Sequence, residues 1–445
     1  MVLGAIAVLT VMLAEFQDET STELAAALAD RDGVQAEFMA RSAVNLARLL
    51  VAAEPTMRTA VAPLFMLMKK TPPQLPVWEF SDRILGAFND QEAAGNFAQS
   101  VGLDLSLGKN LGMPGGRFEL AIVDEDSKIN INLGASNDIA HIRLARELMG
   151  LIAPLQYGPV FEKKDKQGQT SDRLSVCSAI IDWADVDETS FDCNVAQTAA
   201  TSSAPEDAYY QLLQKPYRRK NAPYDSLDEL HMVRGVSEEF WTNFIDPEPQ
   251  NPKKRIVTVW GQGAVNVNTA NAQTLLAIVC SGAPTADICV DPLQASTFLT
   301  GVTMARGITM GAPLFGSATD FTNTMKGQGQ LGPLLAGMGM KPVKFTSESE
   351  FAKSISTESK MFSIYAVGVI KGYKREVRTA IHAVVDFRSA PALTGTGTQP
   401  GTQTGTTPQT GATTTPGSTG NAQTDAILAA TQPSTGGQVV YFRIE

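Results

Sequence analysis

The chain has 445 residues, and 43% of them are hydrophobic, so it is long and apolar enough for two or three packed domains. Its formal net charge of −10 argues against a nucleic-acid partner, because phosphate binding needs clustered lysine and arginine side chains. Two short basic clusters, Arg218 to Lys220 and Lys253 to Arg255, are expected to lie in solvated loops.

Residues 1–53 predict one long helix. As far as Ala14 the segment has no charge and no proline, and its large apolar side chains are Val2, Leu3, Ile6, Val8, Leu9, Val11, Met12 and Leu13. Good helix formers then continue to Ala53. About 20 apolar residues are needed to cross a bilayer, so this segment is short, and we expect the natural chain to begin upstream of Met1. The helix is interpreted either as a single-pass anchor with a stalk or as the spine of a pilin, which packs into a filament.

Residues 54–124 combine proline-rich loops with a helix predicted over Phe80 to Ala94 and a strand predicted over Arg117 to Asp124. Residues 125–345 are interpreted as a domain of short helices. Within it, residues 127–150 and 263–282 share one pattern, in which apolar residues alternate with asparagines before an amphipathic helix. Thr269 or Asn271 is expected to cap the second of these helices. Such segments resemble SAM-like or helix-hairpin-helix modules, and the negative charge favours a packing role over DNA binding.

The C-terminal part of the chain predicts a small antiparallel sheet. Met361 to Lys371 and Glu376 to Phe387 form a hairpin signal within residues 346–388. Residues 389–437 are rich in Thr, Gly and Pro and predict a disordered loop, and residues 438–445 predict a last strand. Neither the early strand nor the late strands form a stable sheet alone. We therefore expect an α+β fold, with the long helix on one sheet and residues 125–345 inserted as a helical domain.

An acidic cluster carries the densest chemistry of the sequence. Carboxylates this close together repel one another unless a cation or solvent intervenes, and calcium accepts six to eight oxygen ligands in irregular loops. The candidate ligands are Asp182, Asp185, Asp187, Glu188, Glu206 and Asp207. The alternatives are a solvated helix end and, less favoured, a glycosidase-like carboxylate pair.

The four cysteines form two local pairs, Cys177 with Cys193 and Cys280 with Cys289, and the first pair flanks the acidic cluster. This spacing favours disulfides over reduced, buried thiols. A bridge between Cys177 and Cys193 would close a loop around the acids and reduce its freedom.

Motifs of catalysis are not found in the sequence. His141, His231 and His382 stand apart from each other and from the cysteines, without the spacing of metal ligands. The phosphate-binding loop, the dinucleotide fingerprint and the nucleophile elbow have no counterpart. We therefore expect a protein that is not an enzyme.

Specific motifs resemble a known family. They are Asp182-Trp183 with further acids, Glu206-Asp207 before two tyrosines, Pro216-Tyr217, Asn221-Ala222-Pro223, and Ser226 to Gly235. Together with the two asparagine-bearing segments, they resemble minor pseudopilin K of bacterial type II secretion over nearly the whole chain. The resemblance implies a pilin-like fold with an inserted helical domain, and calcium at the acidic loop.

The same resemblance implies a place at the tip of the periplasmic pseudopilus, with the helix in the inner membrane and the bulk of the protein in the periplasm. The implied partners are minor pseudopilins of the I and J types, the major pseudopilin, the inner-membrane secretion platform and membrane lipid. The sequence departs from the family in having no prepilin-peptidase site before the apolar segment, and in the extra loop over residues 389–437. The alternatives are a DNA-handling minor pilin of a competence or type IV pilus-like system, and a membrane-tethered hydrolase.

Overall fold

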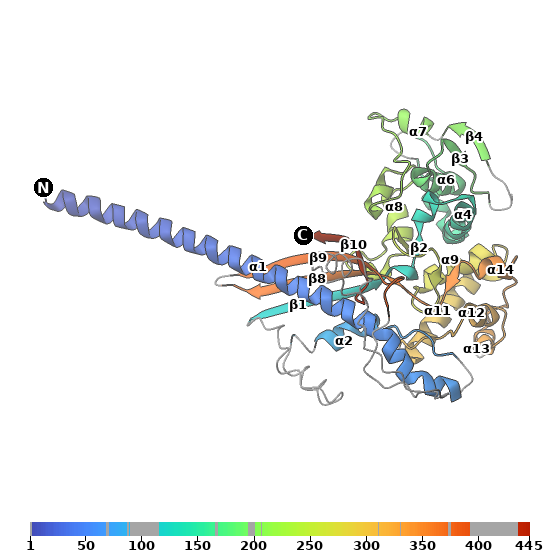
Figure 1. Ribbon diagram of the computed structural model, residues 1–445. Coiled ribbons are helices and arrows are strands. Elements are labelled where there is room, and N and C mark those ends of the chain that lie inside the picture. Colours follow the sequence, from blue (N-terminus) through green and yellow to red (C-terminus); the bar gives the residue numbers. More distant parts are fainter. Residues whose placement is uncertain are drawn as a thin grey trace, which may run out of the picture.

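The computed structural model describes residues 2–67, 71–86, 89, 115–164, 168–194, 201–205, 207–309, 311–329, 331–372, 375–391 and 435–445. Figure 1 shows a long helix whose N-terminal part projects away from the rest of the protein. A sheet lies along the middle of this helix, and a larger, mainly helical region lies beyond one end of the sheet (Figure 1). The combination of a long N-terminal helix with an antiparallel sheet confirms the predicted α+β class.

The sheet has four antiparallel strands in the order β1-β8-β9-β10. Their bounds are Gly116–Asp124 for β1, Met361–Lys371 for β8, Glu376–Asp386 for β9 and Gln438–Ile444 for β10. All four were predicted: β1 and β9 from alternating apolar side chains, and β8 and β10 from runs of strand-forming residues. The C-terminal end of β1 lies beside the start of β8, where Asp124 pairs with Phe362. The chain therefore leaves the sheet and returns to it at the same place.

Helix α1 (Val2–Leu67) is one continuous helix of 66 residues. The prediction that it ends at Ala53 is wrong, because it continues through Pro55 and Pro63. A proline inside a helix costs about 3 kcal/mol, partly through a lost backbone hydrogen bond. Side-chain contacts hold the helix together at this point. The buried carboxylate of Glu54 accepts hydrogen bonds from Arg58 one turn later (2.9 Å) and from the backbone amide of Leu75 (2.8 Å).

The part of α1 that packs on the sheet presents mostly small side chains. They recur every three or four residues and so share one face of the helix: Ala36, Met39, Ala40, Ala43 and Ala47, all fully buried. Strand β8 approaches this face so closely that a Cβ atom on Gly368 would lie 1.9 Å from the carbonyl oxygen of Ala36. The alanine face and this glycine therefore bring helix and sheet into direct backbone contact.

Between α1 and β1 the structure describes a 3-10 turn (Val77–Phe80) and the short helix α2 (Ser81–Leu85). They account for the start of the helix predicted over Phe80 to Ala94, and most of its remainder lies outside the described residues. The loop predicted over residues 389–437 likewise lies almost entirely outside them. No helix of the part that the structure describes is both long and apolar enough to cross a membrane.

The region between β1 and β8 is here called the head, residues 125–360. Its first half contains β2 (Ile129–Asn130), α4 (Asp138–Ile152), α5 (Gly158–Glu162), α6 (Arg173–Ala184), β3 (Thr189–Phe191), β4 (Thr201–Pro205), α7 (Ala208–Gln211), α8 (Glu238–Phe240) and β5 (Val257–Thr258). Its second half contains β6 (Val265–Asn266), α9 (Ala272–Gly282), α10 (Asp287–Val290), α11 (Pro292–Ile308), α12 (Ala318–Met325), α13 (Gly332–Gly337), α14 (Glu348–Phe351) and β7 (Ile355–Ser356).

The head and the sheet bury separate hydrophobic clusters. One cluster runs from Ile129 to Ile355 and contains head residues alone. The other combines α1, the turn at Trp78 and the side of the sheet that faces α1. Because Phe351 and Ile355 pack into the first cluster, the head extends beyond residue 345, where the sequence had placed its end.

The two halves of the head repeat one set of contacts, as the sequence predicted. Strand β2 pairs in parallel with β5, and β6 pairs in parallel with β7. Asn130 accepts a hydrogen bond from the amide of Asn132 (2.9 Å), and Asn266 accepts the same bond from Asn268 (3.0 Å). The side chains of Asn132 and Asn268 then bind the backbone of a distant loop in each half.

The helices that follow these asparagines are capped and packed together. Asn137 accepts from the amide of Ala140 at the start of α4, and Asn271 accepts from that of Thr274 at the start of α9. Asn271 is therefore the cap, and Thr269 has another role described below. The two helices approach closely at Gly150, where a Cβ atom would lie 2.2 Å from the carbonyl oxygen of Ala277.

Candidate functional site

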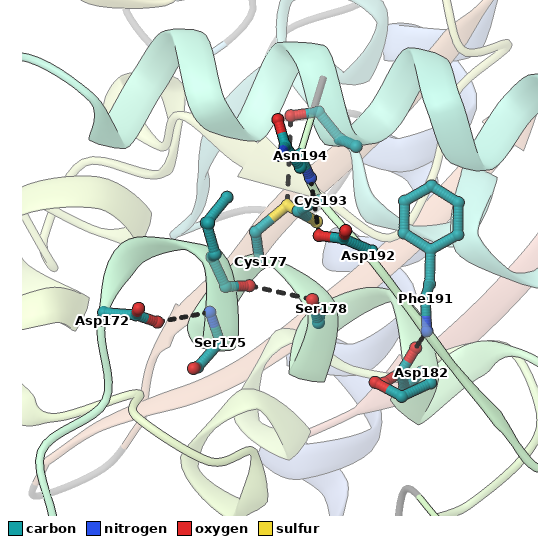
Figure 2. Close-up of a disulfide and its surroundings, with 12 residues drawn as sticks. Asp172, Ser175, Cys177, Ser178, Asp182, Phe191, Asp192, Cys193 and Asn194 are labelled. Atoms are coloured by element: carbon teal, nitrogen blue, oxygen red, sulfur yellow. Dashed lines mark hydrogen bonds between the residues drawn. A yellow bond between two sulfur atoms is a disulfide. The ribbon is translucent and has the colours of Figure 1, made fainter. Parts of the chain in front are cut away.

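The acidic loop follows helix α6 and is tied to that helix by a disulfide. Cys177 of α6 is bonded to Cys193, and Cys280 of α9 is bonded to Cys289 of α10, so both predicted pairs are confirmed. Figure 2 shows the first bridge, with Asp182 near the end of α6 and Asp192 in the loop that follows. Closing a loop of about 15 residues in the unfolded chain is worth roughly 3 kcal/mol of stability. The bridge therefore favours one arrangement of the acids.

Asp182 is the most buried acid of this loop and lies in the last turn of α6. Its carboxylate accepts hydrogen bonds from the backbone amide of Phe191 (2.8 Å) and the hydroxyl of Ser190 (2.9 Å), and Figure 2 shows the first of these. Burial raises the pKa of Asp182 to about 7, although these donors act in the opposite direction. The negative charge of this group is thus poorly compensated in the folded protein.

The next acids line the turn that leads from α6 to β3. Asp185 is buried, accepts a hydrogen bond from the amide of Asp187 (3.2 Å), and lies 3.6 Å from Nδ1 of His141. Asp187 accepts a hydrogen bond from the amide of Thr189 (2.6 Å) and is exposed, as is Glu188. His141 comes from α4, so this helix and the acidic loop meet at Asp185.

Arg219 lies at the centre of the acidic cluster, although its basic run was expected in a solvated loop. It is buried and donates hydrogen bonds to the backbone carbonyl of Asp182 (2.5 Å) and to the carboxylate of Asp207 (3.0 Å). Burial lowers its pKa, against the attraction of Asp182, Asp185, Asp187 and Glu188. The prediction of a solvated position is therefore wrong for Arg219, which supplies one positive charge to several acids.

Aromatic side chains and a capped turn hold the loop against the head. Trp183 packs against Tyr210 (5.8 Å between ring centroids) and Tyr217 (6.3 Å). Ser226 and Glu229 form a capping box at the start of the next 3-10 turn, and Glu229 also pairs with Lys220 (2.9 Å). Glu229 and Lys220 were not among the predicted site residues, and they order the chain that follows the acids.

The donor chemistry of the loop suits calcium, and its charge balance gives a reason for a cation. One guanidinium faces at least three carboxylates, two of them buried, so a bound divalent cation would reduce an electrostatic cost. Within the described residues, no three His, Cys, Asp or Glu side chains are close enough together to hold a metal ion. Glu206, one of the predicted ligands, lies outside the described residues. The calcium site therefore stays a prediction.

Large apolar side chains are exposed along the N-terminal part of α1. They include the residues predicted for a membrane or filament helix, with exposed fractions from 52% at Ile6 to 83% at Leu3. Further along α1, the exposed large apolar side chains include Phe16, Leu24, Val34, Phe38 and Leu49. Exposed apolar residues in such number mark a surface that another apolar surface covers.

The chain is similar to one family model and to solved structures. Residues 166–245 match the family model described as "Type II secretion system (T2SS), protein K". Among solved structures, the chain is similar to one titled "The Crystal Structure of the GspK-GspI-GspJ complex from enterotoxigenic Escherichia coli Type 2 Secretion System". This similarity has 14% sequence identity and a TM-score of 0.43, and covers 80% of this chain and 92% of that chain. No curated protein sequence matches the chain.

The family match covers α6, the acidic loop with its disulfide, and the turn capped by Ser226. The motifs from Asp182 to Gly235 that resemble protein K lie within this match, whereas the two asparagine-bearing segments lie outside it. The match over residues 166–245 therefore confirms that resemblance and relates the chain to protein K of the type II secretion system.

Proposed function

We propose that the protein is a minor pseudopilin that stands at the tip of the type II secretion pseudopilus and helps to start its assembly. It works as a structural subunit and has no catalytic role. The observation that carries this proposal is the protein K match over the disulfide-framed loop of the head. The head is mounted on a helix of 66 residues whose apolar side chains lie open.

The shape of the protein supports a role in a helical filament. The N-terminal part of α1 projects away from the described fold and exposes apolar side chains such as Leu9, Leu13 and Phe16. Packing against the helices of other pilin-type subunits would bury them, and each fully buried large apolar side chain contributes about 1.5–3 kcal/mol. The partners we propose are minor pseudopilins of the I and J types, and below them the major pseudopilin and the inner-membrane platform.

The position of the head supports a place at the filament end. It is an inserted, mainly helical domain with its own core, which lies beyond the sheet at the end opposite the N-terminus. In this proposal the head caps the filament, so that no further subunit stacks above the sheet. In this proposal α1 starts in the inner membrane lipid and the head lies in the periplasm, where the two disulfides form.

Calcium belongs to this proposal as a structural ion of the acidic loop. The proposed ligands are oxygen atoms of Asp182, Asp185, Asp187, Glu188, Glu206 and Asp207. When bound, the ion supplies positive charge next to carboxyl groups whose ionised form is disfavoured by burial. The residues of the chain do the rest: the Cys177–Cys193 bridge limits the loop, and Arg219 holds Asp207 against the backbone of α6.

A secretion assay in the native bacterium tests the proposal. Deletion of the gene is expected to leave type II substrates in the periplasm, and the full chain is expected to restore their export. Phe38→Asp places a charge on the exposed apolar side of α1 and is expected to abolish restoration. Gln35→Asp, at an exposed polar position one turn away, is the control and is expected to restore export. Normal export in the deletion strain would contradict the proposal.

A further inference from the structure

Three consecutive carboxylates lie where the chain leaves the sheet and enters the head. Asp124 is the last residue of β1, and Glu125 and Asp126 begin the following 3-10 turn (Glu125–Ser127). All three are buried, with exposed fractions of 3%, 5% and 2%. Because Asp124 pairs with Phe362, the chain also returns from the head here. The cluster of Asp124, Glu125 and Asp126 with their hydrogen-bond donors is here called the junction.

Asp124 connects the sheet to the second half of the head. Its carboxylate accepts hydrogen bonds from the hydroxyls of Thr269 and Ser359, both at 2.5 Å, and from the amide of Asp126 at 2.9 Å. The Ser359 hydroxyl also accepts a hydrogen bond from the side-chain amide of Asn266 (2.7 Å). Asn266 and Thr269 lie at the start of the second repeat, so this carboxylate joins that repeat to β1.

The other two carboxylates bind different segments. Asp126 accepts hydrogen bonds from the backbone amides of Gln262 (2.8 Å), Lys360 (2.7 Å) and Met361 (3.0 Å). Glu125 accepts from the hydroxyl of Thr258 on β5 (2.5 Å) and from Lys128 (3.0 Å). The junction thus joins both halves of the head and the first residue of β8. Its hydrogen bonds therefore contribute to holding the head on the sheet.

The charges that face the junction do not neutralise it. Lys128 pairs with Glu125 and otherwise reaches the backbone carbonyl of Asp124 (3.3 Å). The nearby cations have their own carboxylates: Arg255 with Asp246, Arg388 with Asp386, and Lys360 with Glu358. Tyr365 and His382 face Glu125, and burial raises the pKa of Tyr365 and lowers that of His382, so both are neutral near pH 7. In the described part of the chain, no cationic side chain pairs with the carboxylates of Asp124 and Asp126.

The pKa of Asp124 lies in the range near neutral pH. Burial raises its pKa to about 7, and the neighbouring Asp126 carboxylate adds to the rise. The pKa of Asp126 is also raised, chiefly by burial. A carboxyl with a raised folded-state pKa binds its proton more tightly when folded, so its contribution to stability is present at low pH. The contribution decreases as pH rises from the unfolded pKa, about 4, through the folded pKa, about 7.

We propose that the junction is a proton-dependent latch between the head and the sheet. It holds the head most firmly while Asp124 carries a proton, and it loosens when that carboxyl ionises beside Asp126. When Asp124 is protonated, its carboxyl is neutral and no longer repels the carboxylate of Asp126. The neutral carboxyl can also donate a hydrogen bond to the hydroxyl oxygen of Thr269 or Ser359. The latch would make the orientation of the head respond to the pH of its compartment.

Amide hydrogen exchange of the full chain in an uncharged detergent, at constant calcium, tests the latch. The readout is the protection of the amides of Gln262, Lys360 and Met361, corrected for the pH dependence of chemical exchange. In the wild type, protection is expected to fall about tenfold between roughly pH 5 and pH 8. In Asp124→Asn, which keeps the size but cannot ionise, the change is expected to be less than about twofold.

Two control variants separate the latch from other titrations. Glu119→Gln changes an exposed acid of the same strand and is expected to behave as the wild type. Glu147→Gln removes a buried acid of α4 whose pKa burial raises to about 8, and it is expected to leave the junction amides pH-dependent. Equal protection at both pH values in the wild type, or full pH dependence in Asp124→Asn, would overturn the proposal.

A second variant covers the case in which Asp124→Asn does not fold. Thr269→Val removes one hydroxyl that favours the ionised form of Asp124. Its loss is expected to move the midpoint of the protection change to higher pH. An unchanged midpoint in Thr269→Val would also overturn the proposal, because the titrating group would then not be the carboxyl that Thr269 contacts.

Discussion

The junction and the acidic loop both bury carboxylates, and they differ in the hydrogen-bond donors and cations that face these groups. Burying a carboxylate costs free energy unless hydrogen-bond donors or cations face it. At the junction, Asp126 is met by three backbone amides and Asp124 by two hydroxyls. In the acidic loop, Asp182 has two donors, and Arg219 serves several carboxylates together. A further cation at the loop would add to the single charge of Arg219 and stabilise these carboxylates.

The residue that tests the cation is Asp185, which is buried and has no role in the disulfide. Calcium at 100 times its dissociation constant should raise the free energy of unfolding by about 2.7 kcal/mol, and the melting temperature with it. Asp185→Asn should lose at least half of that shift in thermal melting. Glu350→Gln, an exposed acid on α14 that pairs with Lys353, is the control and should keep the shift. Equal melting of the wild type with calcium and with chelator would contradict the assignment.

The sequence indicated the acidic loop because several acids lie close together between two cysteines. It could not indicate Arg219, because a basic run is exposed or buried according to which distant segments fold onto it. Asp124 to Asp126 were not singled out either, since three acids at the end of a strand are usually solvated.

Among the elements, the packing of α1 on β8 depends on a close approach of the two backbones at a glycine. A Cβ atom at Gly368 would lie 1.9 Å from the carbonyl oxygen of Ala36 and 2.7 Å from the amide nitrogen of Ala40. Gly368→Ala should therefore push the helix from the sheet and reduce the free energy of unfolding by about 3 kcal/mol or more. Urea unfolding followed by circular dichroism measures this loss.

The matched control variant changes a glycine of α1 that is not packed against the sheet. At Gly33 a Cβ atom would meet no atom within 4 Å, so Gly33→Ala should stabilise α1 by roughly 0.5–1 kcal/mol. If Gly368→Ala unfolds at the same urea concentration as the wild type, the close packing of helix and sheet is not what holds them together.

The elements themselves were largely predictable, because strands and helices carry different periods of apolar residues. β1 and β9 were found in this way, while β8 and β10 were found from strand-forming residue types and the two repeats from their shared asparagine motif. The end of α1 was not, because Pro55 is a signal that usually ends a helix. Here Arg58 pairs with Glu54 across Pro55, and the amide of Leu75, which is distant in the sequence, also binds Glu54.

At the scale of the whole molecule, the protein has two separate hydrophobic cores, one in the head and one between α1 and the sheet. The cluster of α1 and the sheet makes a rigid support, and the cluster of the head makes a domain that enters and leaves the sheet at one place. An insert is tolerated in this position because β1 and β8 pair without help from the chain between them. The nesting was inferred from the sequence, while the exact limits of the head depended on tertiary contacts of Phe351 and Ile355.

The most direct test of the account is the set of proteins that the full chain holds in its native membrane. An affinity-tagged chain should be purified from membranes in mild detergent and its companions identified by mass spectrometry. The account predicts small pilin-type proteins of the I and J kinds in amounts comparable to the chain itself. Recovery of the chain without them, together with salt-dependent binding to duplex DNA, would contradict a structural subunit of the secretion pseudopilus.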